Sequence, residues 1–227
     1  MEVDACRLSV ARRVAGADRV AVILHAQLGV EAVFRPRGEA LAGWDVAIPD
    51  LRGRGRSVCR DESMYSWPRL VDDVVAVCDR VAGNRRVLLA GSSFGSGLAV
   101  ATALAHPDRV AALVLWAPPY AGAAAGWTDG QRAIQQRNLA AAPGDGPKWA
   151  RHDPESITAA LRGLGFAQPF DDVAQLDSIG VAVAVSPGAD DLHLPWIGGS
   201  YLRHLGHGER IDESTAAFST FARRGPN

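Results

Sequence analysis

One serine of the chain stands in a pattern typical of a nucleophile. The segment Gly91–Gly95 reads Gly-Ser-Ser-Phe-Gly, and Ser93 alone in it has a glycine two residues before and two residues after. The apolar run Val87–Ala90 precedes the segment and the alanine-rich stretch Phe94–Ala105 follows it, which predicts a strand, a tight turn and a helix. On such a turn the serine hydroxyl stands above the sheet, and the N-terminal amides of the helix favour a developing negative charge. We therefore expect Ser93 to be a nucleophile.

Two other interpretations of this segment are weaker. A phosphate-binding loop needs the spacing G-x-G-x-x-G or a following Lys-Ser or Lys-Thr pair, and Gly91, Gly95 and Gly97 provide neither. A glycine-rich surface turn with unreactive serines would not need a buried strand before it and a helix after it. The segment therefore favours a nucleophilic serine.

The elements that must position Ser93 are predicted by short apolar runs that alternate with helical patterns. Continuous apolar runs are typical of strands covered on both faces of a sheet. We predict strands over Val20–Leu24, Trp44–Ile48, Val87–Ala90, Val110–Trp116 and Val181–Ser186, and helices over Arg69–Val81, Phe94–Ala105 and a C-terminal stretch with Ala217, Phe218 and Phe221. This alternation implies right-handed crossovers and a mostly parallel sheet, so the predicted fold class is α/β.

The alternation breaks between residues 119 and 170, where prolines and glycines are frequent. The segment has two weaker helical patterns, Thr128–Ala141 and Pro154–Leu161, and Asp153 is a good N-cap for the second. We predict a small cap insertion over residues 119-170, without a core of its own. The core domain is then made of residues 1-118 and 171-227.

Aromatic residues of this cap segment are candidates for a substrate pocket. An insertion of this kind lies over the carboxyl ends of the strands, where Ser93 would be. We expect Trp127, Trp149 and Phe166 to line a pocket for a modest, largely apolar acyl group. The alternative for either tryptophan is packing at the junction between the cap and the core.

The composition excludes several classes of protein. The chain has 227 residues, 48% hydrophobic and 22% charged, as in a globular domain and unlike a disordered chain. A net charge of −1 gives no general attraction to nucleic acid or to an anionic membrane. The apolar runs are much shorter than the ~20 residues of a membrane helix, and Met1–Val10 lacks the apolar stretch of a signal peptide. We therefore expect no nucleic-acid or membrane partner.

Cysteine usage favours a reducing compartment. Cys6, Cys59 and Cys78 are an odd and sparse set without the spacing of a metal site. We therefore expect a cytoplasmic protein rather than a secreted disulfide scaffold.

Several motifs in a consistent order resemble the α/β-hydrolase family. Val20–His25 resembles the strand that ends in the family's His-Gly motif, and Asp50–Ser57 resembles its D-x-R-G-x-G-x-S loop. Gly91–Gly95 matches the family's nucleophile turn, and His106–Val110 followed by Leu113–Leu115 matches a further passage. The resemblance covers nearly all of the chain. It implies an α/β-hydrolase fold, a mostly parallel sheet flanked by helices with a short helical cap, and no cofactor.

The same resemblance implies partners for Ser93. In the family the order along the chain is serine, acid, histidine, and the acid is an aspartate four residues before a proline. Asp191 has this position and its neighbour Asp190 does not. The family's histidine lies in a Gly-His turn near the C-terminus, which the Gly-His-Gly segment around His207 matches. Asp191 would then orient His207, and His207 would act as the general base for Ser93.

The resemblance also implies two amides for an oxyanion hole. They belong to Phe94, directly after the nucleophile, and to Gln27, two residues past the strand-end histidine. The chain departs from the family here, because His25 is followed by Ala26 where the family usually has glycine. The added methyl restricts the turn and could shift the Gln27 amide. The Gln27 side chain could also reach the substrate.

The remaining histidines have ordinary structural explanations. We expect a strand end for His25, a helix end for His106, exposed loops for His152 and His193, and an edge strand for His204. His204 is the main competitor of His207 for the role of base.

A metal site is the alternative for the C-terminal histidines. His193, His204, His207, Asp190 and Asp191 are close in sequence, and the spacing of His204 and His207 resembles half of a zinc site. A metallohydrolase would leave the turn at Ser93 without a purpose, so we expect no metal.

Four arginines stand in a row in the loop that resembles D-x-R-G-x-G-x-S. Arg52, Arg54, Arg56 and Arg60 could contact an anionic ligand. The family-like context and the balanced net charge favour a structural role for this loop.

These observations predict a serine hydrolase that cleaves a small-molecule ester or thioester through an acyl-enzyme. A lyase or acyl transferase of a biosynthetic pathway with the same residues is the alternative, because one fold supports several chemistries. A catalytically silent ligand receptor is a third hypothesis. We expect a monomer or a dimer, and the sequence does not name the substrate.

Overall fold

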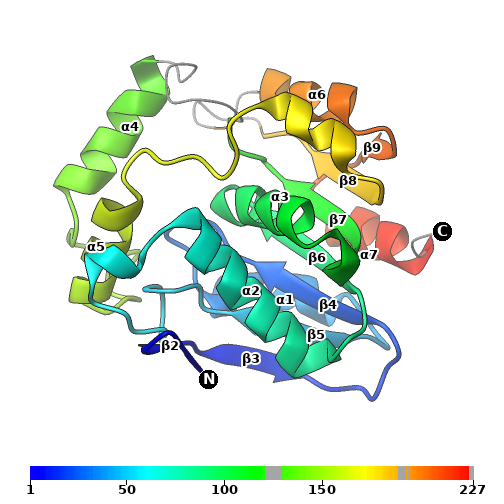
Figure 1. Ribbon diagram of the computed structural model, residues 1–227, viewed down its shortest axis with the longest axis horizontal. Coiled ribbons are helices and arrows are strands. Elements are labelled where there is room, and N and C mark those ends of the chain that lie inside the picture. The colour runs from blue at the N-terminus through cyan, green and yellow to red at the C-terminus, as the bar shows by residue number, and fades with distance from the viewer. Residues whose placement is uncertain (121–128, 189–192, 194, 225–227) are drawn as a thin grey trace.

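The computed structural model describes residues 1–120, 129–188, 193 and 195–224 and has a seven-stranded sheet at its centre (Figure 1). The strand order is β3-β5-β4-β6-β7-β8-β9. The bounds are β3 Val10–Arg13, β4 Val20–Leu24, β5 Asp45–Pro49, β6 Val87–Ser92, β7 Val110–Trp116, β8 Ala182–Ser186 and β9 Gly208–Arg210. The edge strand β3 pairs antiparallel with β5, and all other neighbours pair in parallel. The predicted α/β class with a mostly parallel sheet is confirmed.

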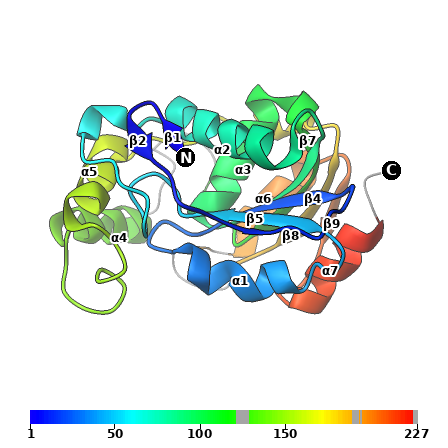
Figure 2. The same ribbon diagram turned by 90° about the horizontal axis from the view of Figure 1, so that it is seen from below.

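Helices cover both faces of this sheet, as Figure 2 shows. They are α1 Glu31–Glu39, α2 Trp67–Ala82, α3 Phe94–Ala105, α4 Asp129–Ala140, α5 Pro154–Leu164, α6 Pro195–His204 and α7 Thr215–Arg224, with short 3-10 helices at Glu62–Met64, Pro107–Arg109 and Val173–Ser178. No helix among the described residues is long and apolar enough to cross a membrane.

Alternate residues of the central strands supply two separate cores. In β4, Val20, Val22 and Leu24 pack in the cluster that includes residues of α2, α3 and α6. Ala21 and Ile23 pack in the cluster that includes residues of α1 and α7. Side chains alternate between the faces of a strand, so a strand buried on both sides must be apolar throughout. This explains why continuous apolar runs predicted the strands.

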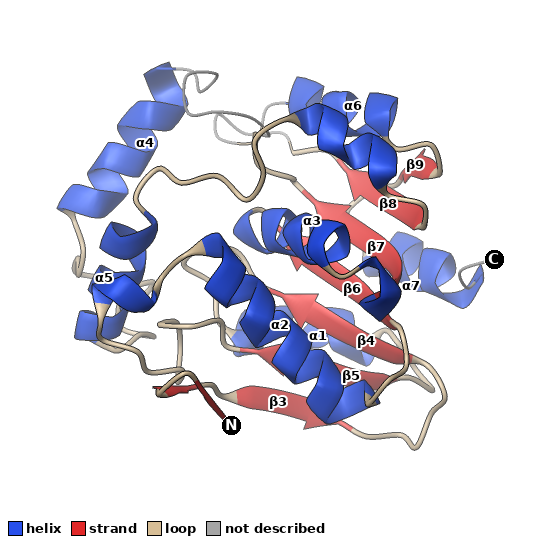
Figure 3. Ribbon diagram, viewed as in Figure 1, coloured by secondary structure: helices blue, strands red, loops and turns tan. Residues whose placement is uncertain are grey.

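The helices α4 and α5 come between β7 and β8 in chain order. They lie beside the end of the sheet where the parallel strands finish (Figure 3). The helix α5 begins as predicted, because the Asp153 side chain accepts a hydrogen bond of 2.9 Å from the Ser156 amide. Trp149, Ile157 and Leu161 form a small cluster of buried residues in this segment. Leu28 from the sheet domain packs against the same cluster, so the segment shares this packing with the core. The boundaries of the cap at residues 119 and 170 stay a prediction.

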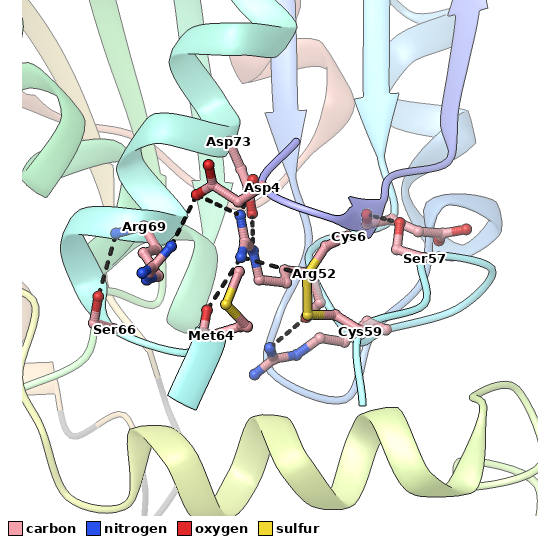
Figure 4. Close-up of polar contacts among 11 residues, drawn as sticks. Asp4, Cys6, Arg52, Ser57, Cys59, Met64, Ser66, Arg69 and Asp73 are labelled. Carbon is pink, nitrogen blue, oxygen red and sulfur yellow. Dashed lines mark hydrogen bonds and ion pairs between the residues drawn. A yellow bond between two sulfur atoms is a disulfide. The ribbon is translucent and has the colours of Figure 1, made fainter. Parts of the chain in front are cut away.

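The loop after β5 is held by ion pairs (Figure 4). The guanidinium of Arg52 is fully buried and donates two hydrogen bonds of 2.7 Å to Asp73 on α2. Arg56 pairs with Asp50 and Glu31, and Arg60 pairs with Asp153 and Glu155. The predicted structural role is confirmed for these three arginines. Arg54 differs from them and is treated below.

The N-terminal segment is joined to this loop by a disulfide between Cys6 and Cys59, which Figure 4 shows. Both residues are buried, and an antiparallel bridge between Arg7 and Val58 brings their backbones together. The expectation of a reduced cysteine set is wrong for this pair, because 53 residues separate the two in sequence and nothing in the spacing shows that they meet. Cys78 is free and buried, and burial raises the pKa of its thiol to about 12.

We predict that reduction of Cys6–Cys59 destabilises the fold. Closure of a chain segment of 53 residues restricts the unfolded state, which in the chain-entropy model contributes about 4 kcal/mol. Reductant should therefore lower the melting temperature by about 10 °C. In denaturant, thiol titration should find one thiol per chain before reduction and three after it, since Cys78 alone is free.

The matched control is the double variant Cys6→Ala/Cys59→Ala, whose melting temperature should not respond to reductant. Three titratable thiols in the untreated wild-type chain would contradict the prediction.

Candidate active site

Ser93 lies on a strained turn between β6 and α3. Its φ of 51° and ψ of −114° fall in a region that residues other than glycine rarely adopt. A Cβ at Gly91 would collide with the carbonyl of Gly95, and a Cβ at Gly95 would collide with the carbonyl of Leu24 at the end of β4. Both glycines are therefore required by close backbone approach. The predicted strand, turn and helix around Ser93 are confirmed.

His193 lies against this serine. Its Nε2 is 2.6 Å from the Ser93 Oγ, within hydrogen-bond distance. The residue stands between β8 and α6 and is half-buried. The expectation that His193 is an exposed loop residue is wrong. A histidine in this position can take the proton of the serine hydroxyl.

His207 is not near Ser93, and its assignment as the base is corrected. It is exposed and directly precedes β9, and its carbonyl accepts a hydrogen bond of 3.1 Å from Val183 at the beginning of β8. Since β9 runs parallel to β8, this turn lies at the amino edge of the sheet. Ser93 follows β6 at the opposite, carboxyl edge. The Gly-His-Gly segment therefore misled the prediction.

Once the strands are known, their order points to His193. A catalytic histidine must follow a strand at the carboxyl edge, and the segment Ile211–Ser214 that follows the last strand contains no histidine. The segment that follows β8 contains His193. The other competitor, His204, lies in α6 rather than in an edge strand, and its Nδ1 is 3.0 Å from a carboxylate oxygen of Asp177.

Two predicted site residues, Asp191 and Trp127, lie outside the described residues, as does Asp190, the neighbour that was not chosen as the acid. The assignment of Asp191 as the acid stays a prediction. Among the residues that the structure describes, no group of three or more His, Cys, Asp or Glu side chains could hold a metal ion.

Gln27 and Phe94 both face the cavity that contains Ser93. The peptide between Ala26 and Gln27 is held by its carbonyl, which is 2.7 Å from the His25 Nδ1 and accepts a bond of 2.8 Å from the Gly29 amide. In a trans peptide the N–H points opposite to the C=O, so these bonds also fix the direction of the Gln27 amide. The methyl of Ala26 is compatible with this turn. The oxyanion role of Phe94 and Gln27 stays a prediction.

The cavity has an aromatic wall and several carboxamides. Trp67, Phe94 and Tyr120 line it together with Leu164 and prolines, and the rings of Trp67 and Phe94 lie 4.8 Å apart. The side-chain amides that line it belong to Gln27, Gln135, Asn138 and Gln168. None of the described residues that line it is Asp, Glu, Lys or Arg. The described lining therefore combines apolar surface with neutral hydrogen-bonding groups.

Trp149 and Phe166 are not among the described residues that line this cavity. The pocket role of Phe166, whose neighbours Gly165 and Ala167 line the cavity, stays a prediction. Trp149 packs on Ile157 and Leu161, with Leu28 from the core against the same cluster. This is the junction packing that the sequence left as the alternative. Among the described residues, the tryptophan that lines the cavity is Trp67, the first residue of α2, whose Nε1 donates to the Ala167 carbonyl at 3.0 Å.

Two further predicted histidine positions can be compared with the structure. His25 is fully buried at the end of β4, and its Nε2 accepts a hydrogen bond of 2.9 Å from the Leu51 amide, so the expected backbone bonding is confirmed. His152 is buried rather than exposed, because its Nδ1 accepts a bond of 2.9 Å from the Gly55 amide in the loop after β5.

Comparison with known proteins agrees with this architecture. Residues 39–161 match the family model described as serine aminopeptidase, S33. The chain belongs to this family of α/β hydrolases. A protein named "Putative carbamate hydrolase RutD" from Caulobacter vibrioides (strain NA1000 / CB15N) is 36% identical over 108 residues, 45% of this chain. The match spans 40% of the length of that relative.

Two longer matches support the fold of this α/β hydrolase. A protein of the same name from Variovorax paradoxus (strain S110) is 28% identical, over 87% of this chain and 88% of its own length. The structure of a thermophilic esterase from Thermogutta terrifontis is 18% identical, with a TM-score of 0.79 over 96% of this chain and 93% of that chain. At this identity the esterase shows the common fold alone.

We predict that this α/β hydrolase loses stability in acid partly through His25. Burial lowers the pKa of His25 from the ordinary 6.5 to about 4, because desolvation disfavours the charged ring. The unfolded chain thus binds a proton between these two pH values and the folded chain does not. The free energy of unfolding therefore falls as the pH falls below about 6.5. The loss reaches about 3 kcal/mol near pH 4.

The measurement is urea unfolding at several pH values between 4.5 and 7 for the wild type and His25→Gln. The variant should be less stable at pH 7 and should show a shallower slope of unfolding free energy against pH. Equal slopes for the two proteins would show that His25 does not contribute.

Proposed function

We propose that this protein is a serine hydrolase that cleaves an ester or thioester of a small, uncharged molecule. The observation that carries the proposal is the distance of 2.6 Å between His193 Nε2 and Ser93 Oγ. The strained turn at Ser93 and the neutral cavity around the pair support it. An unreactive serine at an exposed surface turn would require neither the strained backbone nor the cavity.

The reaction follows from the positions of these groups. His193 Nε2 takes the hydroxyl proton as Ser93 Oγ attacks the carbonyl carbon, and the carbonyl oxygen becomes an oxyanion. The amides of Phe94 and Gln27 donate hydrogen bonds to this oxyanion. His193 then returns the proton to the leaving alcohol or thiol as the tetrahedral intermediate collapses to an acyl-enzyme. Water then attacks the acyl-enzyme carbonyl while His193 takes its proton. His193 returns this proton to Ser93 Oγ as the carboxylic acid is released. The reaction needs no cofactor.

We propose that Asp191, which the sequence assigned as the acid for His207, orients His193 instead. A carboxylate beside the Nδ1 of the base holds the ring in the right tautomer and stabilises the imidazolium that forms. Asp191 is two residues before His193 in the segment after β8. Base and acid would then come from one segment at the carboxyl edge of the sheet.

The substrate class follows from the lining of the cavity. A carboxylate or ammonium group brought into a site without a counter-charge would lose its hydration without compensation. Carboxamides from Gln27, Gln135, Asn138 and Gln168 can donate to and accept from neutral polar groups. The name of the relatives adds a carbamate to the esters and thioesters that should be tested.

The cytoplasmic location predicted from the cysteines now depends on the Cys6–Cys59 disulfide. Such bonds persist mainly in oxidising compartments, so the thiol titration described above also tests this location. The substrate is the one partner that the site itself implies, and the prediction of a monomer or dimer stands.

We predict that Ser93→Ala and His193→Ala each lower kcat on p-nitrophenyl butyrate by several orders of magnitude. Each variant removes one half of the proton-transfer pair, and losses of about 10⁴- to 10⁶-fold are typical of such pairs. His207→Ala is the matched control and should keep the wild-type rate, because His207 lies at the opposite edge of the sheet.

The opposite pattern, with His207→Ala inactive and His193→Ala active, would overturn the assignment of the base. If Ser93→Ala kept more than a tenth of the activity, the nucleophile would be wrong. If the acyl group passed to an alcohol or amine in preference to water, the protein would be a transferase.

We predict that the enzyme discriminates against charged acyl groups. On esters of matched size, mono-p-nitrophenyl succinate should show kcat/KM at least about tenfold below p-nitrophenyl butyrate, because no Lys or Arg is among the described residues that line the cavity and could pair with its carboxylate. The measurement is kcat/KM for both esters at pH 7. Equal values, or a preference for the succinate, would contradict the proposed substrate class.

A further inference from the structure

Arg54 is a buried cation without a counter-ion. Its side chain has 0% exposure, and none of the ion pairs among the described residues includes it. Its neighbours Arg52, Arg56 and Arg60 each pair with a carboxylate. Burial lowers the pKa of Arg54 to about 10, so the guanidinium still carries its charge at neutral pH. A buried, unpaired charge is costly for a fold, and the loop structure does not explain why one is kept here.

The contacts of Arg54 converge on the candidate active site. Its Nε donates to the carbonyl of Gln27 at 3.2 Å, and its Nη1 donates to the carbonyl of Arg52 at 2.8 Å. Its Cζ lies 4.9 Å from the centroid of the Phe94 ring, in a cation–π contact. Its Nη2 is buried and has no hydrogen-bond partner among the described residues. One guanidinium therefore touches both residues whose amides are candidates for the oxyanion hole.

We propose that Arg54 is a positioning residue that holds the two halves of the oxyanion hole together and makes their surroundings positive. This inference rests on the proposed function. The Gln27 peptide bonds come from a loop and the Phe94 amide from the beginning of α3, so no regular hydrogen-bond ladder joins them. Arg54 joins them through the Gln27 carbonyl and the Phe94 ring.

The charge of Arg54 also has an effect that its hydrogen bonds do not have. The resting site holds no described carboxylate against this cation, whereas the tetrahedral intermediate adds a negative oxygen beside Gln27 and Phe94. In a water-poor surrounding the two charges attract each other more strongly than in water. The attraction exists in the transition state and not with the neutral substrate, so it accelerates the reaction rather than tightening binding.

The experiment compares Arg54→Met, Arg54→Lys and the control Arg56→Met in the full-length protein. Arg56 has a side chain 68% exposed and belongs to the same loop, without contact to Gln27 or Phe94 in the described bonds. The readouts are kcat, KM, the inhibition constant of a trifluoromethyl ketone that forms a tetrahedral adduct, and the melting temperature.

We expect Arg54→Met to lower kcat about 10- to 100-fold, in the range of a lost oxyanion donor, with KM within about threefold. The affinity for the ketone should fall by the same factor as kcat/KM. The melting temperature should stay equal or rise, because the variant removes an unpaired buried charge. Arg54→Lys keeps the charge without the two carbonyl bonds, so its kcat should lie between those of the wild type and Arg54→Met. Arg56→Met should match the wild type in kcat and ketone affinity.

Two results would overturn the inference. One is wild-type kcat and ketone affinity in Arg54→Met. The other is a lower melting temperature with a loss of activity that affects KM and kcat alike, which would make Arg54 a structural residue. If Arg54→Met does not fold, wild-type kcat in Arg54→Lys would be decisive against the carbonyl contacts. Ser93→Ala separates this failure from that of the proposed function: if Ser93→Ala is inactive and Arg54→Met is fully active, the inference alone is wrong.

Discussion

The close approach of α3 to the ends of β4 and β6 is the constraint on which the candidate site depends. Gly91 and Gly95 leave no room for a side chain, because the carbonyls of Gly95 and Leu24 occupy the space. This contact forces the backbone of Ser93 into its strained conformation and brings the end of β4 beside the nucleophile. The turn after β4, which carries Gln27, is next to Ser93 for the same reason. One packing contact thus places the serine and one candidate oxyanion donor together.

Basic groups around this contact are treated in two different ways. His25 is buried with both ring nitrogens bonded to backbone, and its low pKa of about 4 keeps it neutral. Arg54 is equally buried and stays charged, because a guanidinium gives up its proton only at high pH. The neutral ring fixes the shape of the turn after β4, whereas the cation also affects the electrostatic potential. His25 therefore contributes to the geometry of the site, and Arg54 contributes its positive charge as well.

The sequence predicted the central elements well because these elements are buried and therefore consist of continuous apolar runs. The helix Phe94–Ala105 and the strand Val110–Trp116 were predicted to the residue. The helix α6 was missed, since its two internal glycines, Gly198 and Gly199, weaken the helical pattern. The base was misassigned because a Gly-His-Gly motif does not say at which edge of the sheet it lies. That depends on where β9 begins, and β9 has three residues.

Contacts over long separations could not be predicted from local patterns. The pairing of Cys6 with Cys59 depends on how the N-terminal segment crosses the loop after β5. The position of Trp149 depends on how α5 meets the core, which the composition of the cap segment does not show. Trp67 lines the cavity because α2 begins there, and its sequence neighbours give no sign of this.

The attachment of α5 to the core has a consequence for how substrate preference could diverge. The Cys59 amide donates to Ser156 Oγ at 3.1 Å, and the Tyr65 hydroxyl donates to the Ser156 carbonyl at 3.3 Å. The wall that Leu164 and Gly165 contribute is therefore anchored to the sheet domain. Gln135 and Asn138 come instead from α4, which lies beside α5 at the same end of the sheet in Figure 1. Relatives with new substrates should accumulate their differences in α4 and preserve α5, because changes in α4 alter the lining and leave the hydrogen bonds of Ser156 to the sheet domain in place.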